Sequence, residues 1–472
     1  MTTSDKAIAL QLVSPPQPVC VSIGDPFKVT VRVLASNVDR CAIKIIFDET
    51  ILEDVTEEPN PRQLGNGKIV EDVSWLLRAR EEKNRTDVVI EGRANGLFQK
   101  AQFFVEVTNR MRQTQSLTYQ EAGVDTEQQD RAMPLLGQWI ERSFALRPGE
   151  VKLPLGYFAN VVDIGNGIGL AVSTDGVGTK ILIAQMLDKY DTIGIDCVAM
   201  NVNDVLCVGA EPVALLDYIA VEVPHPDLLG ALAEGLYRGA ELARVTIPGG
   251  EIAQVKEMIH GIRRDYAFDL VATCVGKVPL DRILTGAHIS DGDIIVGLAS
   301  SGIHSNGLTL ARRVFFDDLH WAPDHYVEEL GHSIGEELLE PTRIYVREVL
   351  EMINAGLKVK ALAHITSTGF LNLTRAEAPV SYVLDALPEP SPIFQMIQAY
   401  GKIADAEMCF TYNMGVGFCV VVDTEDVDAV RAIARKHNVQ AYTIGFTVKD
   451  QQKAVRIPSL KLVGRNGKIW PL

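Results

Sequence analysis

Short runs in which apolar and polar positions often alternate fill residues 1–112. Examples are AIALQLV, FKVTVRVLA, DVVIEGRA and AQFFVEVT, and turn-forming Pro, Gly, Asn and Asp residues separate the runs. A period of two is typical of strands with one buried face, so this segment predicts a small antiparallel β-sandwich, roughly immunoglobulin-like in class. One helix is predicted over Ser74–Glu82, and the polar stretch Asn109–Gln115 is predicted to be a linker.

The pattern changes after the linker, where helical periodicity alternates with apolar strands. Helices are predicted over Gln128–Leu146, Asp191–Val208 and His225–Ala243, and apolar runs such as VALLDYIAV and DIIVGLASS predict strands. The predicted fold class is α/β (α+β), with two related α/β halves, residues 113–285 and 286–472, preceded by the all-β module 1–112. The run Val213–Val223 is too apolar for an exposed sheet edge, so we expect it to pair with its copy in a homodimer.

Composition narrows the classes of function. The 472-residue chain has a formal net charge of −16, which argues against a nucleic-acid partner because a phosphate backbone requires a basic surface. No apolar run approaches the roughly 18 residues that span a membrane, and the N-terminus does not have the pattern of a signal peptide. Seven dispersed cysteines, none in a C-x-x-C pair, indicate buried free thiols in a reducing cytoplasm.

A glycine turn after an apolar strand is the first candidate site. The strand GLAV leads into STDGVGTK, where Gly176 and Gly178 allow a tight turn and a close approach to a ligand. Asp175 offers oxygen ligands to a hard cation such as Mg²⁺, while Lys180, after Thr179, offers a positive charge to phosphate. An ordinary turn remains the alternative, because the segment is not a Walker A loop.

Two further segments add polar groups to this candidate metal–nucleotide site. Asn203 and Asp204 lie off the apolar face of the predicted helix, where both can face a cleft. Gly250 and Glu251 follow a short predicted strand, and a glutamate beyond two glycines can reach Mg²⁺ without crowding. The predicted metal ligands are therefore Asp175, Asp204 and Glu251, with a solvated turn glutamate as the alternative for Glu251.

The second half contains SSGIHSNG between a predicted strand and a predicted helix. Free N–H groups at a helix N-terminus attract anions, and His304 and Asn306 can add directional hydrogen bonds. Helix capping by Ser305 or Asn306 is an alternative that can hold at the same time. His364, in AHITSTGF, is a candidate acid/base or orienting group, against a structural role as the alternative.

Several segments together resemble one enzyme family. DGVGTK, DTIGID, VAMNVND, GAEP and LLDY occur in the order and spacing of aminoimidazole ribonucleotide synthetase, also called phosphoribosylformylglycinamidine cyclo-ligase. SSGIHSNG and LLEPTRIYV extend the resemblance, which covers about residues 116–455 and is closest to the archaeal branch. Two segments depart from the family. GGEIAQ stands where the family has GGETAE, and Ser367-Thr368 replace two glycines of AHxTGGGF.

The resemblance implies an ATP- and Mg²⁺-dependent ring closure of formylglycinamidine ribonucleotide to aminoimidazole ribonucleotide, carried out by a homodimer. It implies that Asp175, Asp204 and Glu251 hold Mg²⁺–ATP, and that His304, His364 and Asn306 act on the ribonucleotide. The nucleotide-binding residues that it implies are Asp175, Gly176, Gly178, Thr179, Lys180, Asn203 and Gly250. It also suggests that Gly156-Tyr157-Phe158 forms a loop over nucleotide phosphates; the alternative is a simple β-turn.

Two other functions stay open at the level of the sequence. One is a related small-molecule kinase of the same superfamily. The segments DTIGID, HSNG and PTRIYV together favour the cyclo-ligase over such a kinase. The other is a non-catalytic scaffold in which the N-terminal β module binds a partner. Ser367-Thr368 favours this scaffold slightly, whereas the intact DGVGTK, GGE and HSNG segments oppose it.

Overall fold

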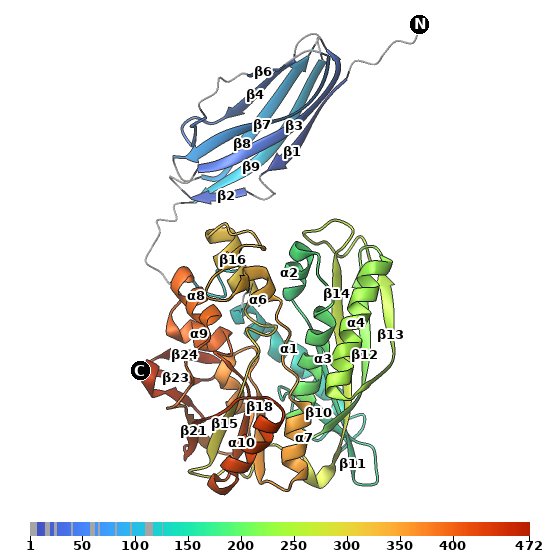
Figure 1. Cartoon of the computed structure of the whole chain (residues 1–472), viewed down its shortest axis with the longest axis vertical. Coiled ribbons are helices and arrows are strands. Elements are labelled where there is room, and N and C mark those ends of the chain that lie inside the picture. Colours follow the sequence, from blue (N-terminus) through green and yellow to red (C-terminus); the bar gives the residue numbers. More distant parts are fainter. Residues whose placement is uncertain are drawn as a thin grey trace. The chain divides into compact units, whose positions relative to one another are not determined.

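The structure is a computed structural model in which the chain forms two compact units, Met1–Gln115 and Ser116–Leu472 (Figure 1). It describes residues 7–14, 19–22, 26–38, 41–56, 62–64, 67–80, 83–94, 97–108, 117–124 and 126–472. Each unit has its own hydrophobic core. The predicted linker, Asn109–Gln115, lies outside the described residues. No helix among those described is long and apolar enough to cross a membrane.

The described part of the first unit consists of strands in two sheets. One sheet has the order β1-β3-β7-β5 and the other β2-β9-β8-β4-β6. All described pairs are antiparallel except β2–β9, which is parallel. The strands are β1 (Ala7–Ser14), β2 (Val19–Ser22), β3 (Pro26–Val38), β4 (Cys41–Phe47), β5 (Leu52–Asp54), β6 (Arg62–Leu64), β7 (Gly67–Ala79), β8 (Lys83–Ala94) and β9 (Leu97–Thr108).

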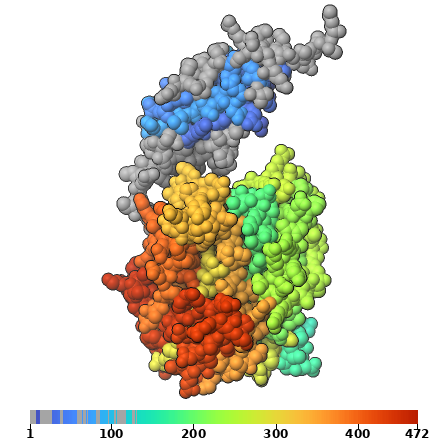
Figure 2. Space-filling model, viewed as in Figure 1, coloured from blue at the N-terminus to red at the C-terminus, as the bar shows by residue number. Residues whose placement is uncertain are grey.

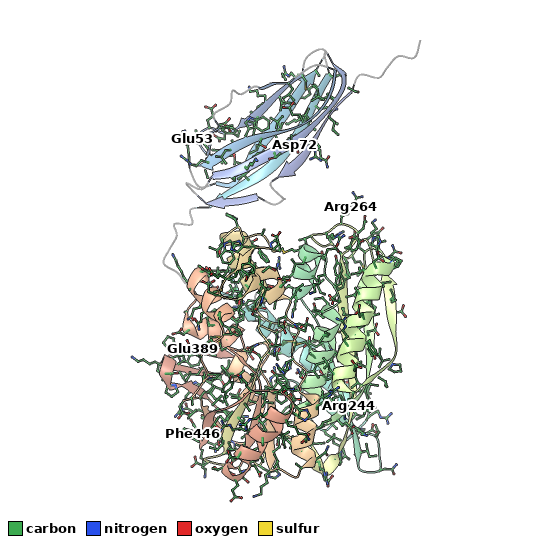
Figure 3. All side chains as sticks on the ribbon, in the orientation of Figure 1. Glu53, Asp72, Arg244, Arg264, Glu389 and Phe446 are labelled. Carbon is green, nitrogen blue, oxygen red and sulfur yellow. The ribbon has the colours of Figure 1, made fainter. Side chains whose placement is uncertain are left out.

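The helix predicted over Ser74–Glu82 is wrong, because strand β7 runs through this segment as far as Ala79. Trp75, Leu77 and Ala79 are buried in the core while Leu76 and Arg78 are exposed, which is the period of a strand. The short apolar run WLL is compatible with either element, and pairing with β3 decides it. Further along the same pair, Asp72, labelled in Figure 3, forms an exposed ion pair with Arg32.

The first half of the second unit is built on a five-stranded sheet of order β10-β11-β14-β12-β13. Helix α3 lies on this sheet and α4 packs on α3 (Figure 1). The two helices approach closely: a Cβ on Gly194 would lie 2.1 Å from the Leu236 nitrogen. The elements are α1 (Thr126–Phe144), β10 (Asn160–Asp163), β11 (Ile168–Gly176), α2 (Lys180–Leu187), α3 (Ile193–Leu206), β12 (Glu211–Val221), α4 (Pro226–Ala243), β13 (Thr246–Gln254) and β14 (Phe268–Pro279).

Two expectations about this sheet are wrong. The run Val213–Val223 was expected to pair with its copy. Strand β12, which covers most of this run, instead pairs with β14 on one side and β13 on the other, so it has no free edge for a second copy. The Pro248–Glu251 segment does not follow a strand but lies inside β13, paired in parallel with β12. A Cβ on Gly250 would lie 2.5 Å from the Asp217 carbonyl, so this glycine is required by strand pairing.

The second half contains an eight-stranded sheet of order β18-β20-β15-β21-β19-β22-β23-β24. The two halves lie beside each other, green and orange to red in Figure 2. The helix predicted after SSGIHSNG is a five-residue α5, Leu308–Arg312, that continues as a π-helix, Arg313–Asp318. The main strands and helices are β15 (Ile294–Ala299), α5 (Leu308–Arg312), α6 (Ile334–Leu338), α7 (Val346–Asn354), β18 (Val359–His364), β19 (Val380–Val383), α8 (Pro392–Gly401), α9 (Asp405–Thr411), β20 (Val416–Val422), α10 (Val427–Lys436), β21 (Ala441–Lys449), β22 (Val455–Ile457), β23 (Leu462–Arg465) and β24 (Lys468–Pro471).

Candidate active site

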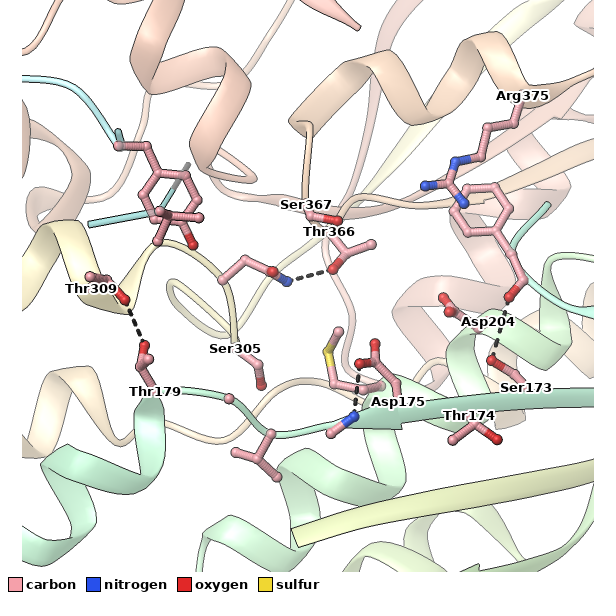
Figure 4. A pocket seen from close by; sticks show the side chains of 18 of the residues that line it. Ser173, Thr174, Asp175, Thr179, Asp204, Ser305, Thr309, Thr366, Ser367 and Arg375 are labelled. Carbon is pink, nitrogen blue, oxygen red and sulfur yellow. Dashed lines mark hydrogen bonds between the residues drawn. The ribbon is translucent and has the colours of Figure 1, made fainter. Parts of the chain in front are cut away.

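A pocket of about 480 Å³ lies where the loops of the two halves meet (Figure 4). The end of β11 and the turn after it form one wall, and α3 adds two side chains to it. Loops of the second half and two aromatic segments complete the pocket. The lining residues are Tyr119, Val124, Tyr157, Phe158, Ser173, Thr174, Asp175, Gly176, Val177, Gly178, Thr179, Met200, Asp204, Ser305, Asn306, Thr309, Thr366, Ser367 and Arg375.

Asp175 is fixed at the end of β11 by its backbone. The Asp175 N–H donates to the Asn201 side-chain oxygen at 3.0 Å, and the Asn201 amide nitrogen donates to the Asp175 carbonyl at 3.0 Å. Asn201 lies on α3 and is fully buried, so it anchors this strand end to the helix beneath. The Asp175 carboxylate itself accepts the Gly176 N–H at 2.8 Å. Its position in the pocket is therefore set by the fold before any ligand binds.

Asp175 and Asp204 bring two carboxylates into one partly buried space. Burial, together with the neighbouring charge of Asp204, raises the pKa of Asp175 to about 6. Two carboxylates that repel each other are stabilised by a hard cation between or beside them. Within the described residues no group of three or more His, Cys, Asp or Glu is arranged to hold a metal ion. Asp175 and Asp204 are the carboxylates of this pocket that could contribute to holding such a cation.

His364 supports Asp204 from the second half. The His364 Nδ1 atom lies 2.9 Å from the Asp204 carboxylate, and both side chains are largely buried. The His364 backbone N–H also donates to the Cys207 sulfur at 3.2 Å, which ties the end of β18 to the end of α3. The other ring nitrogen of His364, Nε2, is buried and has no hydrogen-bond partner among the described residues.

The loops of the second half are held against the pocket by side-chain hydrogen bonds. The Asn306 amide donates to the Thr366 hydroxyl at 2.5 Å, and the Thr179 and Thr309 hydroxyls lie 2.9 Å apart across the two halves (Figure 4). Buried Asn372 donates to the carbonyls of Ser367 and Gly369, which fixes the loop that contains Thr366. Asn306 therefore reaches the pocket with its amide already oriented.

His304 is buried beside the pocket and does not line it. Its Nε2 atom accepts hydrogen bonds from the backbone N–H groups of Ser301 and Arg343 at 3.3 and 3.5 Å. Burial lowers the pKa of His304 well below its usual value, so the imidazole is neutral. Through these hydrogen bonds His304 stabilises the conformation of the SSGIHSNG loop, which places Ser305 and Asn306 at the pocket.

His364 does not line the pocket itself but contacts it through Asp204, and four other predicted site residues do not line it either. Lys180 is fully buried and directed at Asp196, and Asn203 bonds to the backbone of the second half. Gly250 serves strand pairing, and Glu251 is exposed on β13. The structure therefore brings together Asp175 and Asp204 of the three predicted metal ligands, and Gly176, Gly178, Thr179 and Asn306 with them.

Arg375 is a site residue that the sequence reasoning missed. It is the one cationic side chain that lines the pocket, and its guanidinium lies 4.5 Å from the centre of the Phe158 ring. Burial lowers the pKa of Arg375, as expected for a poorly solvated charge. Among the described residues no hydrogen-bond or ion-pair partner is recorded for it. The family segment around AHITSTGF points to this region, but no local pattern marks position 375.

Comparison with known proteins gives matches over most of the second unit. Residues 156–278 match the N-terminal domain model of AIR synthase related proteins, and residues 290–458 match the C-terminal domain model. A phosphoribosylformylglycinamidine cyclo-ligase of Methanothermobacter thermautotrophicus is 49% identical over 67% of this chain and 91% of its own length. The enzyme of that name from Methanocaldococcus jannaschii is 45% identical over 74% of this chain and 96% of its own length. Among solved structures, thiamine-monophosphate kinase of Stenotrophomonas maltophilia aligns with 19% identity and a TM-score of 0.47, over 67% of this chain and 93% of its own.

Proposed function

Because the chain belongs to the phosphoribosylformylglycinamidine cyclo-ligase family, we propose that it converts formylglycinamidine ribonucleotide to aminoimidazole ribonucleotide in purine biosynthesis, with ATP as co-substrate. The observation that carries the proposal is the near-complete span of the relatives by this chain, together with the paired carboxylates in a polar pocket. Residues of STDGVGTK and VAMNVND in the first half and of SSGIHSNG and AHITSTGF in the second half line this pocket.

The reaction requires that the amide oxygen, which is a poor leaving group, be converted into a good one. ATP phosphorylates the formyl oxygen of the amide, a substrate nitrogen attacks the same carbon, and phosphate departs as the ring closes. The pocket has to hold two anionic ligands in line and stabilise the charge that moves between them. Fixed hydrogen-bond donors and one cationic side chain meet that requirement.

Individual residues take the following proposed roles. Asp175 and Asp204 hold Mg²⁺, which neutralises triphosphate charge when bound. His364 keeps the Asp204 carboxylate in one orientation through its 2.9 Å hydrogen bond. Asn306, oriented by Thr366, donates to the reacting amide or to a phosphate oxygen.

We also propose that the enzyme is a cytoplasmic homodimer that acts on a small ribonucleotide. The six described free cysteines are buried thiols without disulfides, which suits a reducing compartment. Exposed apolar side chains on the first-half sheet support self-association.

The test is a direct assay of the purified full-length protein with ATP, Mg²⁺ and formylglycinamidine ribonucleotide. We expect aminoimidazole ribonucleotide and ADP in equal amounts, and no product when either substrate is omitted. The Asp175→Asn variant is the negative control, because a neutral amide is a poorer ligand for Mg²⁺. ADP formation without ring closure would favour a kinase, and no turnover with a correctly folded protein would favour a scaffold.

A further inference from the structure

Four polar side chains from both halves meet in a buried cluster beside the pocket, which we call the inter-half network: Lys180, Asp196, Ser305 and Thr342. Lys180 and Asp196 are fully buried, and the Lys180 Nζ atom lies 2.9 Å from Asp196 Oδ1. The same ammonium group donates to the Glu340 carbonyl at 2.5 Å. Lys180 therefore joins α2, α3 and the chain that precedes α7.

The Asp196 carboxylate is the centre of this network. Its Oδ1 atom accepts the Thr342 N–H at 2.8 Å and the Thr342 hydroxyl at 2.6 Å. It also accepts the Ser305 hydroxyl at 3.2 Å, and the Ser305 and Thr342 hydroxyls lie 2.9 Å apart. One carboxylate of the first half thus holds two segments of the second half, and Ser305 is adjacent to Asn306 in the pocket wall.

The segment 340–345 depends on these contacts because it has no regular secondary structure. Its backbone groups need partners from elsewhere when buried. Asn203 of α3 supplies two, since its amide donates to the Arg343 carbonyl at 2.9 Å and its oxygen accepts the Tyr345 N–H at 3.1 Å. Ser301 adds a hydrogen bond to the Pro341 carbonyl at 2.5 Å. The segment is therefore held between α3 and the SSGIHSNG loop.

We propose that Lys180 is a positioning residue, which holds the buried Asp196 carboxylate in place so that Ser305 and Asn306 are correctly placed in the pocket. It is not a phosphate ligand, because its ammonium group is fully buried, bonds to Asp196 and the Glu340 carbonyl, and does not line the pocket. The inference rests on the proposed function, because it concerns the geometry of that same pocket. It also explains why DGVGTK, DTIGID, HSNG and PTRIYV occur together: each segment supplies one member of the network.

The test compares Lys180→Met with the double variant Lys180→Met/Asp196→Leu. Removing one partner leaves a buried unpaired charge, whereas apolar replacement of both partners is often tolerated. We expect the single variant to lower Tm by about 5–15 °C. The double variant should recover most of that Tm while its kcat/KM stays at least about tenfold below wild type, since Ser305 and Thr342 have lost their acceptor.

Lys360 offers a matched control. It is a largely buried lysine that bonds to Asp293 at 2.6 Å, at the opposite end of β18 from His364. Lys360→Met should also lower Tm, but kcat/KM measured well below that Tm should stay within about threefold of wild type.

Two outcomes overturn the proposal. If the double variant recovers both Tm and kcat/KM, the network is merely structural. If Lys180→Met keeps the wild-type Tm but raises KM for ATP, Lys180 contacts phosphate. Amide hydrogen exchange over residues 301–310 gives a readout without turnover: we expect faster exchange in both Lys180 variants and wild-type exchange in Lys360→Met. An inactive wild-type protein with this exchange pattern would refute the proposed function and leave the network intact.

Discussion

Asp175 and Asp204 place two carboxylates in one pocket, which makes ligand binding depend on pH. With the pKa of Asp175 raised to about 6, this group is protonated in the free enzyme below that pH. We expect the apparent Kd for Mg²⁺–ATP to rise roughly tenfold per pH unit below about pH 6, because the metal needs the carboxylate. Isothermal titration calorimetry between pH 5 and 8 measures this dependence.

The sign of the stability change separates this effect from acid unfolding. The folded pKa of Asp175 lies above its unfolded value, so protonation of Asp175 favours the folded state, and its contribution to stability falls as pH rises from about 4 to 6. Weak binding at pH 5 is therefore not a sign of lost structure at this residue. In Asp204→Asn the repulsion is absent, so the pH midpoint should move down; an unchanged midpoint would contradict this account.

Arg375 should bind an anionic group of the substrate. We expect Arg375→Met to raise KM for the ribonucleotide by about 10–100-fold, with KM for ATP changed less than about threefold, because a charge-assisted hydrogen bond to phosphate is lost. Met retains much of the packing on Phe158, so the fold should survive.

A surface arginine is the control for the loss of one positive charge. Arg238 on α4 is half exposed and pairs with Asp191 and Glu234, away from the pocket lining. Arg238→Met should leave both KM values near wild type. A selective rise of KM for ATP in Arg375→Met would instead place this side chain at the nucleotide.

The loop after β18 contains a strained residue, which the family's glycines would avoid. Thr368 has φ +68°, a left-handed conformation that costs a β-branched residue about 1–2 kcal/mol. We therefore expect Thr368→Gly to raise the free energy of unfolding by about 0.5–1 kcal/mol, measured by urea denaturation.

Its two neighbours are the controls. Ser367 lies outside the left-handed region, so Ser367→Gly should lower the free energy of unfolding by about 0.5–1 kcal/mol. A Cβ on Gly369 would lie 2.0 Å from the Cys409 carbonyl, so Gly369→Ala should cost at least about 2 kcal/mol. Equal effects at 367 and 368 would contradict the role of φ.

For helices and strands, the sequence was informative where one local pattern determined the element. The helices α1, α3 and α4 begin and end within about two residues of their predictions, because their apolar spacing extends over several turns. The Ser74–Glu82 segment failed because a short apolar run fits both periods. Asn201 and Arg375 were missed because their roles arise from contacts between residues distant in sequence. Lys180 was predicted to lie near phosphate but is fully buried, and a charged residue type gives no sign of such burial.

The second unit leaves an apolar surface uncovered, which predicts a homodimer. Apolar side chains on β11, β12 and β13 of one sheet are exposed, including Ile168 at 44%, Tyr218 at 42% and Ile252 at 51%. Such patches mark interaction surfaces, and a second copy of the chain is the partner that we propose. Light scattering at micromolar concentration should give twice the chain mass of 51.7 kDa.

Substitution on β12 tests which surface is used. Tyr218→Lys should shift the protein towards the monomer, because it places a charge in the proposed interface. Leu242→Lys, at an exposed position on α4, is the control and should remain dimeric. A monomeric wild-type protein would refute the prediction.

The N-terminal unit should be dispensable for catalysis. It has its own core of buried residues on two sheets, and the pocket begins at Tyr119 in the other unit. We expect a variant without residues 1–112 to be dimeric and to retain kcat/KM within about threefold of the full chain. A tenfold loss with unchanged circular dichroism of the remaining unit would assign the module to the active site.

The inter-half network also restricts the routes by which this sequence can change over generations. Asp196 bonds to Thr342, 146 positions away, and Lys180 to Asp196 and the Glu340 carbonyl. A single substitution at Lys180 or Asp196 leaves a buried charge without its partner. A lineage would therefore have to pass through a destabilised single variant before a second substitution restored stability. These positions should therefore be inherited as a block, and natural variants should replace them together or not at all.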